Sequence, residues 1–96
     1  MHMEQNLQFG DLVVSTAGRD KGKYLIVISV QGKTAKVVDG KTRKIFAPKQ
    51  KNIKHLKTVE SATMKSLAEK IQKGVSVGNK VVYRRIKTQT QKIQED

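Results

Sequence analysis

Cysteine and tryptophan are absent from this 96-residue chain, and aromatic residues make up only 4% of it. Without cysteine there is no disulfide framework, no thiolate zinc site and no cysteine nucleophile. No stretch approaches the ~18 apolar residues that span a bilayer, and residues 1–6 lack the apolar core of a signal peptide. We therefore expect a single cytoplasmic domain without a membrane partner.

Acidic residues are also scarce, which makes the chain strongly basic. It has 8 Asp and Glu against 20 Lys and Arg, and its formal net charge is +12. Such an excess on a small domain favours a polyanionic partner, namely RNA, DNA or an acidic membrane surface. The membrane is the weakest of the three, because the apolar stripe over residues 61–73 is small and lacks Trp and Phe. A basic surface without a partner is the alternative. The charge is densest over residues 41–57, which hold seven Lys and Arg and no acid.

Residues suited to catalysis are few and lie far apart in the sequence. The acids of the expected domain are Asp11, Asp20, Asp39, Glu60 and Glu69. Catalysis would need a nucleophile with a base, paired carboxylates or a set of metal ligands. We therefore expect no enzyme, and no catalytic residue, metal, cofactor or small-molecule substrate. Asp11 is expected to cap the entry of a strand, and Asp39 a hairpin.

Short apolar runs separated by turn residues predict β structure over residues 7–58. The expected strands are 12–14, 24–30, 34–38, 42–47 and 53–59. Asp39-Gly40 predicts a two-residue hairpin turn with positive φ at both positions. Strands at this spacing are typical of a small barrel. Residues 24–28 are apolar on both faces of their strand, so we expect the rest of the chain to cover the outer face.

The periodicity becomes helical after residue 60. Four apolar residues have the spacing of one helix face, which predicts a helix over 61–73: Met64, Leu67, Ala68 and Ile71. Ser61 is the expected N-cap, and Gly74 the expected C-cap glycine.

Residues 79–92 carry a weaker signal. Asn79 could cap a helix in which Val82, Ile86 and Ile93 share a face. The β-branched and aromatic residues at 81–83 favour a strand instead. We predict a helix over 79–92 and keep the strand as the alternative.

The stretch Gly18–Lys23 combines glycines with basic residues between two expected strands. Gly18 and Gly22 allow a tight loop and the close approach of a partner. Arg19, Lys21 and Lys23 supply cations beside backbone amides that we expect to be exposed, a combination suited to phosphate binding. A solvated loop without a ligand is the alternative.

This stretch and the residues before it resemble the KOW motif of ribosomal proteins and of transcription elongation factors of the NusG type. The shared residues are Gly10-Asp11, Val13 and Gly18-Arg19-Asp20-Lys21-Gly22-Lys23. The usual motif has another glycine two residues after the last lysine of the loop, where this chain has Leu25, or Ile26 if the alignment shifts by one residue. In lacking this glycine, the chain is similar to the archaeal and eukaryotic large-subunit proteins of the fourteen-e group. Asn52-Ile53-Lys54-His55-Leu56 also resembles an Asn-x-x-His-Leu segment that closes the barrel in that group.

The chain looks most like the small KOW-domain RNA-binding proteins of clostridial bacteria. The resemblance covers residues 8–58 well and 59–96 loosely. It implies a mainly β fold with α, in which an SH3-like barrel of four or five strands occupies residues 8–59. One or two C-terminal helices from residues 60–96 would pack on this barrel, and residues 1–7 would form a flexible N-terminus.

We therefore expect an RNA-binding protein associated with the ribosome or its RNA. The expected RNA-binding residues are Gly18, Arg19, Lys21, Gly22, Lys23, Lys41, Arg43, Lys44, Lys49, Lys51, Lys54 and His55. Structured ribosomal RNA is the expected partner, and ribosomal proteins are possible further partners. The alternative is a protein-binding adaptor of the transcription or translation machinery, which would need an exposed apolar patch near Val38, Phe46 or Ile86.

The few aromatic residues are assigned mainly to packing. Phe9 and Tyr24 are expected to pack in or over the barrel. Phe46 is expected under the helix; if exposed, it could stack on a base. Tyr83 precedes Arg84-Arg85, so RNA contact by this basic helix face is a less favoured alternative.

Overall fold

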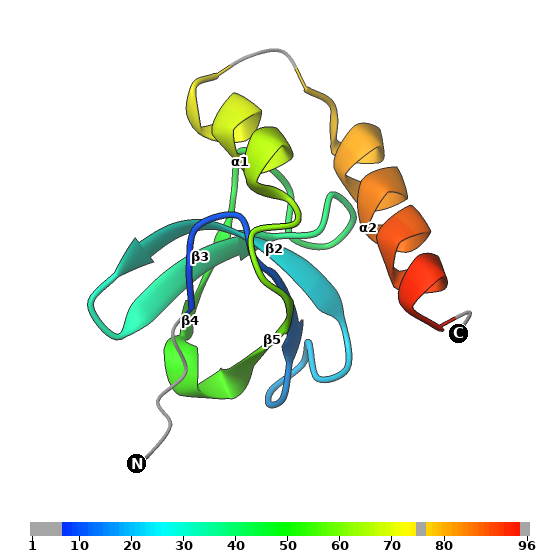
Figure 1. Cartoon of the computed structure of the whole chain (residues 1–96). Coiled ribbons are helices and arrows are strands. Elements are labelled where there is room, and N and C mark those ends of the chain that lie inside the picture. Colours follow the sequence, from blue (N-terminus) through cyan, green and yellow to red (C-terminus); the bar gives the residue numbers. More distant parts are fainter. Residues whose placement is uncertain (1–6, 75–76, 95–96) are drawn as a thin grey trace.

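The computed structural model describes residues 7–74 and 77–94, which form five strands, one 3₁₀ turn and two α-helices (Figure 1). The expected flexible N-terminus at 1–7 falls outside the described residues except for Leu7, whose side chain is buried. In chain order the elements are β1 (Leu12–Ser15), β2 (Tyr24–Gln31), β3 (Thr34–Val38), β4 (Lys49–Asn52), η1 (Ile53–His55), β5 (Leu56–Glu60), α1 (Lys65–Gln72) and α2 (Asn79–Gln94).

The strands form one antiparallel sheet in the order β4-β3-β2-β1-β5. β4 and β5 are its two edges, yet only η1 separates them along the chain. A flat five-stranded sheet is about 19 Å wide, because neighbouring strands lie ~4.8 Å apart. Three residues of 3₁₀ helix span only about 6 Å. The sheet therefore curls strongly, although backbone pairing does not close it among the described residues.

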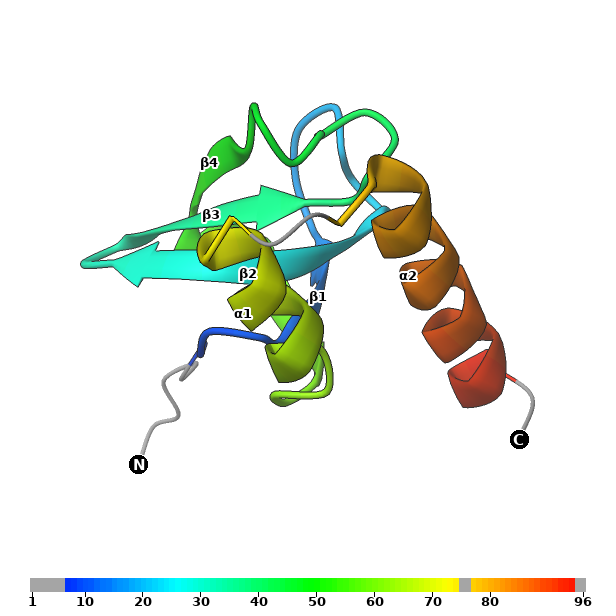
Figure 2. The same cartoon turned by 90° about the horizontal axis from the view of Figure 1, so that it is seen from above.

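Alternate residues of β2 enter two separate cores, as the doubly apolar run predicted. Leu25 and Val27 lie in the core inside the curl, together with residues of β1, β3 and β5. Ile26 and Ile28 face the other way, into a core completed by residues of α1 and α2. Figure 2 shows both helices beside the sheet. The expectation that the C-terminal segment covers the outer face is confirmed.

The predicted strand at 42–47 and the two-residue turn before it are wrong. Residues 39–48 form a long loop, and the return strand β4 starts only at Lys49. Asp39 does not have positive φ, whereas Gly40 has φ 80°. The Asp39 carboxylate Oδ1 instead accepts the N–H groups of residues 41, 42 and 43, at 2.7–2.9 Å. This side-chain capping, expected of Asp39 for a hairpin, stabilises a wider turn.

The predicted strand at 53–59 is divided. Residues 53–55 are the 3₁₀ turn η1, and Asn52 caps it by accepting the N–H of Lys54 at 3.0 Å. Only Leu56–Glu60 continue as β5, paired with β1. The Asn52 cap favours a turn at the point where the chain passes from one edge of the sheet to the other.

Helix α1 starts four residues later than predicted, and Ser61 is not its N-cap. The Oδ1 atom of buried Asp11 accepts the N–H of Ala62 at 2.7 Å and the Ser61 hydroxyl at 3.4 Å, and Ala62 has φ 56°. Residues 61–64 are thereby held in turns before the helix. The end was predicted correctly, since Gly74 follows the C-cap with φ 76°. The apolar stripe is also confirmed, because Met64, Leu67 and Ala68 are buried and Ile71 packs against them.

Residues 79–94 are helical, which confirms the predicted helix and excludes the strand alternative. Val82 and Ile86 are buried, and Ile93 packs against the same core. The Asn79 side chain does not cap its own helix, because its Oδ1 accepts the N–H of Ile45 at 2.9 Å. The start of α2 is thus attached to the β3–β4 loop. Gly40 is required there, since a Cβ atom would clash with the Asn79 carbonyl oxygen.

Candidate nucleic-acid interface

The β1–β2 loop is a tight turn whose shape depends on glycine. Gly18 and Gly22 have φ values of 79° and 86°, which side chains rarely allow. Three N–H groups of the loop donate to carbonyl oxygens of the same turn: Lys21 to Gly18, Gly22 to Ser15 and Lys23 to Asp20. The expectation of exposed amides is therefore wrong for these residues. At these three residues a ligand would be bound by side chains rather than by backbone amides.

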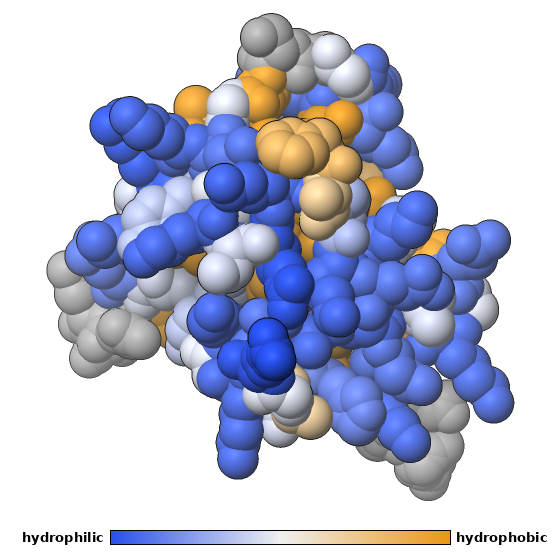
Figure 3. Space-filling view, turned by 180° about the vertical axis from the view of Figure 1, so that it is seen from behind, coloured by the Kyte–Doolittle hydropathy of each residue, from blue (hydrophilic) through white to orange (hydrophobic). Residues whose placement is uncertain are grey.

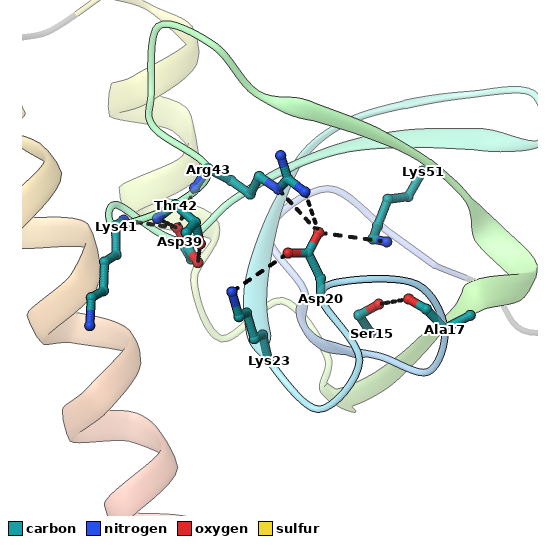
Figure 4. A network of polar contacts seen from close by, with 9 residues as sticks. All are labelled: Ser15, Ala17, Asp20, Lys23, Asp39, Lys41, Thr42, Arg43 and Lys51. Atoms are coloured by element: carbon teal, nitrogen blue, oxygen red, sulfur yellow. Dashed lines mark hydrogen bonds and ion pairs between the residues drawn. The ribbon is translucent and has the colours of Figure 1, made fainter.

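The loop turns one acid inward, and three cations converge on it (Figure 4). Asp20 is only 2% exposed. Its Oδ2 accepts the Nε–H of Arg43 at 3.1 Å, and Nη2 of Arg43 lies 3.0 Å from the same atom. Lys51 Nζ lies 3.7 Å from Oδ2, and Lys23 Nζ lies 3.9 Å from Oδ1. We call Asp20, Lys23, Arg43 and Lys51 the anchored cluster, because it ties the β1–β2 loop to the β3–β4 loop and to β4.

The anchored cluster has two positive charges more than its carboxylate balances. A buried carboxylate needs cationic partners to offset its lost hydration, so part of this charge has a structural role. The partners differ in exposure: the Lys51 side chain is 10% exposed, Arg43 26% and Lys23 44%. Lys23 is therefore the partner most accessible to a ligand.

A second set of cations on the same loops and on β4 and η1 is exposed. Among residues 7–74 and 77–94, all ion pairs involve Asp20, so the members of this set have no acidic partner there. We call them the unpaired cations: Arg19, Lys21, Lys44, Lys49 and Lys54. Their charge is available to an external anion without loss of an internal contact. Viewed from behind, the surface is mostly hydrophilic, and its apolar side chains lie mainly in the upper part of the view (Figure 3).

The structure brings most, but not all, of the predicted site residues together. β4 lies beside the β1–β2 loop, since a Cβ atom added to Gly18 would be 3.8 Å from Nζ of Lys51. The carbonyl of half-buried His55 accepts the N–H of Thr16, so η1 also adjoins this loop. Lys41 is directed elsewhere, to the ring of Tyr83 on α2, with 5.5 Å between Nζ and the ring centroid.

Three residues of this region differ from the expectation. Asp20 was placed in the KOW-like motif and among the scattered acids, without the role that it has as the one acid inside the basic loop. Lys87 was not considered, although it follows Tyr83 by one helical turn, a spacing at which side chains meet; its Nζ lies 5.8 Å from the ring centroid. Phe46 was expected under the helix and is 81% exposed, because the preceding Ile45 takes the inward position against the core.

Two other kinds of site are absent from the described part of the chain. Its residues contain no group of three or more His, Asp or Glu placed to hold a metal ion. Neither α1 nor α2 is long and apolar enough to cross a membrane. Comparison with protein-family models found no match, and no curated protein matched the chain.

Proposed function

We propose that this chain is a cytoplasmic RNA-binding protein associated with the ribosome or its RNA, and that its loops and β4–η1 segment bind phosphates. The observation that carries this proposal is the set of unpaired cations beside the anchored cluster. Exposed Lys and Arg side chains without internal partners attract polyanions, whereas paired ones contribute to the fold.

The anchored cluster supports the same function by holding its surroundings in place. Arg43 and Lys51 connect three segments through one carboxylate, so the exposed cations on these segments start from a fixed arrangement. Preorganised groups lose less conformational freedom on binding. Few side chains here are suited to reading bases, so we propose recognition of structured RNA by shape and phosphate position.

We further propose that the curled sheet is an SH3-like barrel of the KOW type. Three features support this: a glycine loop between β1 and β2, the five-stranded antiparallel order, and a 3₁₀ turn leading directly into the last strand. The two helices are then additions on its outer face. A KOW barrel agrees with RNA binding, although some KOW modules bind proteins.

The protein-binding adaptor remains the second candidate, with less support. It requires an exposed apolar patch near Val38, Phe46 or Ile86. Val38 and Ile86 are buried. Phe46 is 81% exposed, and Val81 and Tyr83 near Ile86 are less exposed, at 46% and 38%. Single exposed apolar residues are common on protein surfaces. The cations therefore favour RNA over a protein partner.

The test is binding of the full chain to a fluorescein-labelled ribosomal RNA hairpin, followed by anisotropy from 50 to 300 mM KCl. About seven phosphate contacts give a log–log slope on the order of −5. Binding with a slope near zero would favour the adaptor. No binding at 50 mM KCl would overturn the proposal.

Sedimentation in the native host tests the ribosomal part. The protein should co-sediment with the large subunit at low salt and be released by a high-salt wash. Retention through the wash would indicate contacts other than phosphates. Recovery only in the soluble fractions at low salt would exclude the ribosome as the partner.

A further inference from the structure

A pocket lies between the sheet and α2, beside the β3–β4 loop. Its volume is about 300 Å³, at the lower end of the range for small-molecule sites. Residues from β2 and its preceding loop, the β3–β4 loop and α2 line it: Lys23, Tyr24, Asp39, Lys41, Thr42, Tyr83, Ile86, Lys87 and Thr90. No function assigned above uses this pocket as a whole.

The charges of the pocket suit an anion. Three lysines reach it, and Lys41 and Lys87 both stand over the Tyr83 ring, with Nζ 5.5 and 5.8 Å from its centroid. The one acid, Asp39, is 7% exposed. Its two carboxylate oxygens already accept three N–H groups and the Thr42 hydroxyl, so its charge is stabilised within the loop. Among the residues that the structure describes, neither of the two ammonium groups beside the Tyr83 ring has an anionic partner.

Apart from Thr42 and Thr90, the rest of the lining is largely apolar. The rings of Tyr24 and Tyr83 border the pocket together with Ile86. Tyr83 is 38% exposed, so its ring is accessible from solvent. A ligand that satisfies both parts of the pocket therefore has a planar aromatic group joined to a phosphate. A nucleotide has this chemistry.

We propose that the pocket binds one unpaired nucleotide of the RNA, with its base against Tyr83 and Ile86 and its phosphate at Lys41 and Lys87. This inference rests on the proposed RNA-binding function and adds a preference for a bulged or looped nucleotide. A phosphate would draw the two lysines off the ring, because a charge-assisted hydrogen bond is stronger than an exposed cation–π contact. The freed ring could then stack on the base.

The experiment compares two hairpins that are identical except for one bulged nucleotide. Anisotropy at a single salt concentration gives the Kd of the full chain for each. The bulged hairpin should bind about five- to tenfold more tightly, the lower part of the range for one stacked base. In Tyr83→Leu the two hairpins should bind with equal Kd values, and in Tyr83→Phe the difference between their Kd values should remain. Val81→Ala, at an exposed α2 residue outside the pocket, should also leave it unchanged.

The remaining outcomes separate this proposal from the proposed function. Equal affinity for both hairpins would overturn the pocket proposal while RNA binding stands. If neither hairpin binds, the proposed function fails, and the ¹H–¹⁵N spectrum is recorded with adenosine monophosphate and with inorganic phosphate. Shifts at Tyr83, Ile86 and Thr90 with the nucleotide alone would reassign the pocket to a free nucleotide. No shifts with either compound would overturn the proposal.

Discussion

The anchored cluster and the unpaired cations contain the same kinds of residue in adjoining segments, yet their surroundings differ. Arg43 and Lys51 lie on a buried carboxylate and are 26% and 10% exposed. Lys44 and Lys49 come from the same loop and strand but are exposed and have no acidic partner among the described residues. A count of basic residues cannot separate these two groups.

The difference shows how a strongly basic domain can fold around its own charge. One acid at the centre of three cations gives the loops a fixed arrangement, and the remaining cations are left for a partner. Stability and RNA affinity should therefore respond to different substitutions. Variants of the two groups test this separation.

Asp20→Asn should have the largest effect on stability. It removes the only carboxylate of the anchored cluster and leaves three cations facing one another. Breaking a buried ion pair costs 3–5 kcal/mol; since Arg43 and Lys23 can turn toward water, we expect a loss of about 2–3 kcal/mol. Urea denaturation followed by circular dichroism measures it.

The control for Asp20→Asn is Glu69→Gln, which removes the same charge from an exposed position on α1. It should change the free energy of unfolding by less than about 0.5 kcal/mol. Equal losses in both variants would mean that net charge, rather than the cluster, stabilises the fold.

Arg43→Ala and Lys44→Ala form a matched pair with a smaller expected difference. Arg43 is bound to Asp20 through two nitrogens, whereas Lys44 is exposed. Arg43→Ala should cost about 1.5–2 kcal/mol, the lower part of the range for a hydrogen bond to a charged group, and Lys44→Ala less than about 0.5 kcal/mol. The same denaturation measurement applies. A loss in Lys44→Ala as large as in Arg43→Ala would contradict the division of the cations into two groups.

Much of the fold could be predicted from apolar spacing. The doubly apolar run in β2 indicated two cores, and the stripe from Met64 to Ile71 indicated the helix that covers one of them. β4 escaped prediction because its residues, Lys49–Asn52, include no apolar side chain. It pairs with β3 through its backbone at the edge of the sheet. The apolar pair Ile45-Phe46, shortly before β4, therefore led to a predicted strand at 42–47 instead.

The candidate site could be predicted only as a set of residues. Glycines and cations in the β1–β2 loop indicated a turn with basic side chains. The pairing of Asp20 with Arg43 and Lys51 joins three segments that come together only in the folded chain, and local spacing does not report such contacts. The role of Asp39 is local, but its side chain favours either a hairpin or a wider turn.

The double variant Arg19→Ala/Lys21→Ala should have the smallest effect on stability but should weaken the salt dependence of RNA binding. Both residues are exposed, so the free energy of unfolding should stay within about 0.5 kcal/mol of the parent. If each binds one phosphate, the log–log salt slope should become shallower by about one to two units. Salt titrations against the ribosomal RNA hairpin measure both slopes.

Lys70→Ala/Lys73→Ala is the matched control for this variant, because it removes the same charge from another part of the chain. Lys70 lies in α1 and Lys73 is its C-cap, and both are exposed. The control variant should lower affinity slightly through net charge and leave the slope within about half a unit of the parent, because a cation without a phosphate contact releases no counterion. Equal slopes in the two double variants would show that charge attracts RNA without a defined surface. A shallower slope in Arg19→Ala/Lys21→Ala alone would place phosphates at the β1–β2 loop, where the unpaired cations adjoin the anchored cluster.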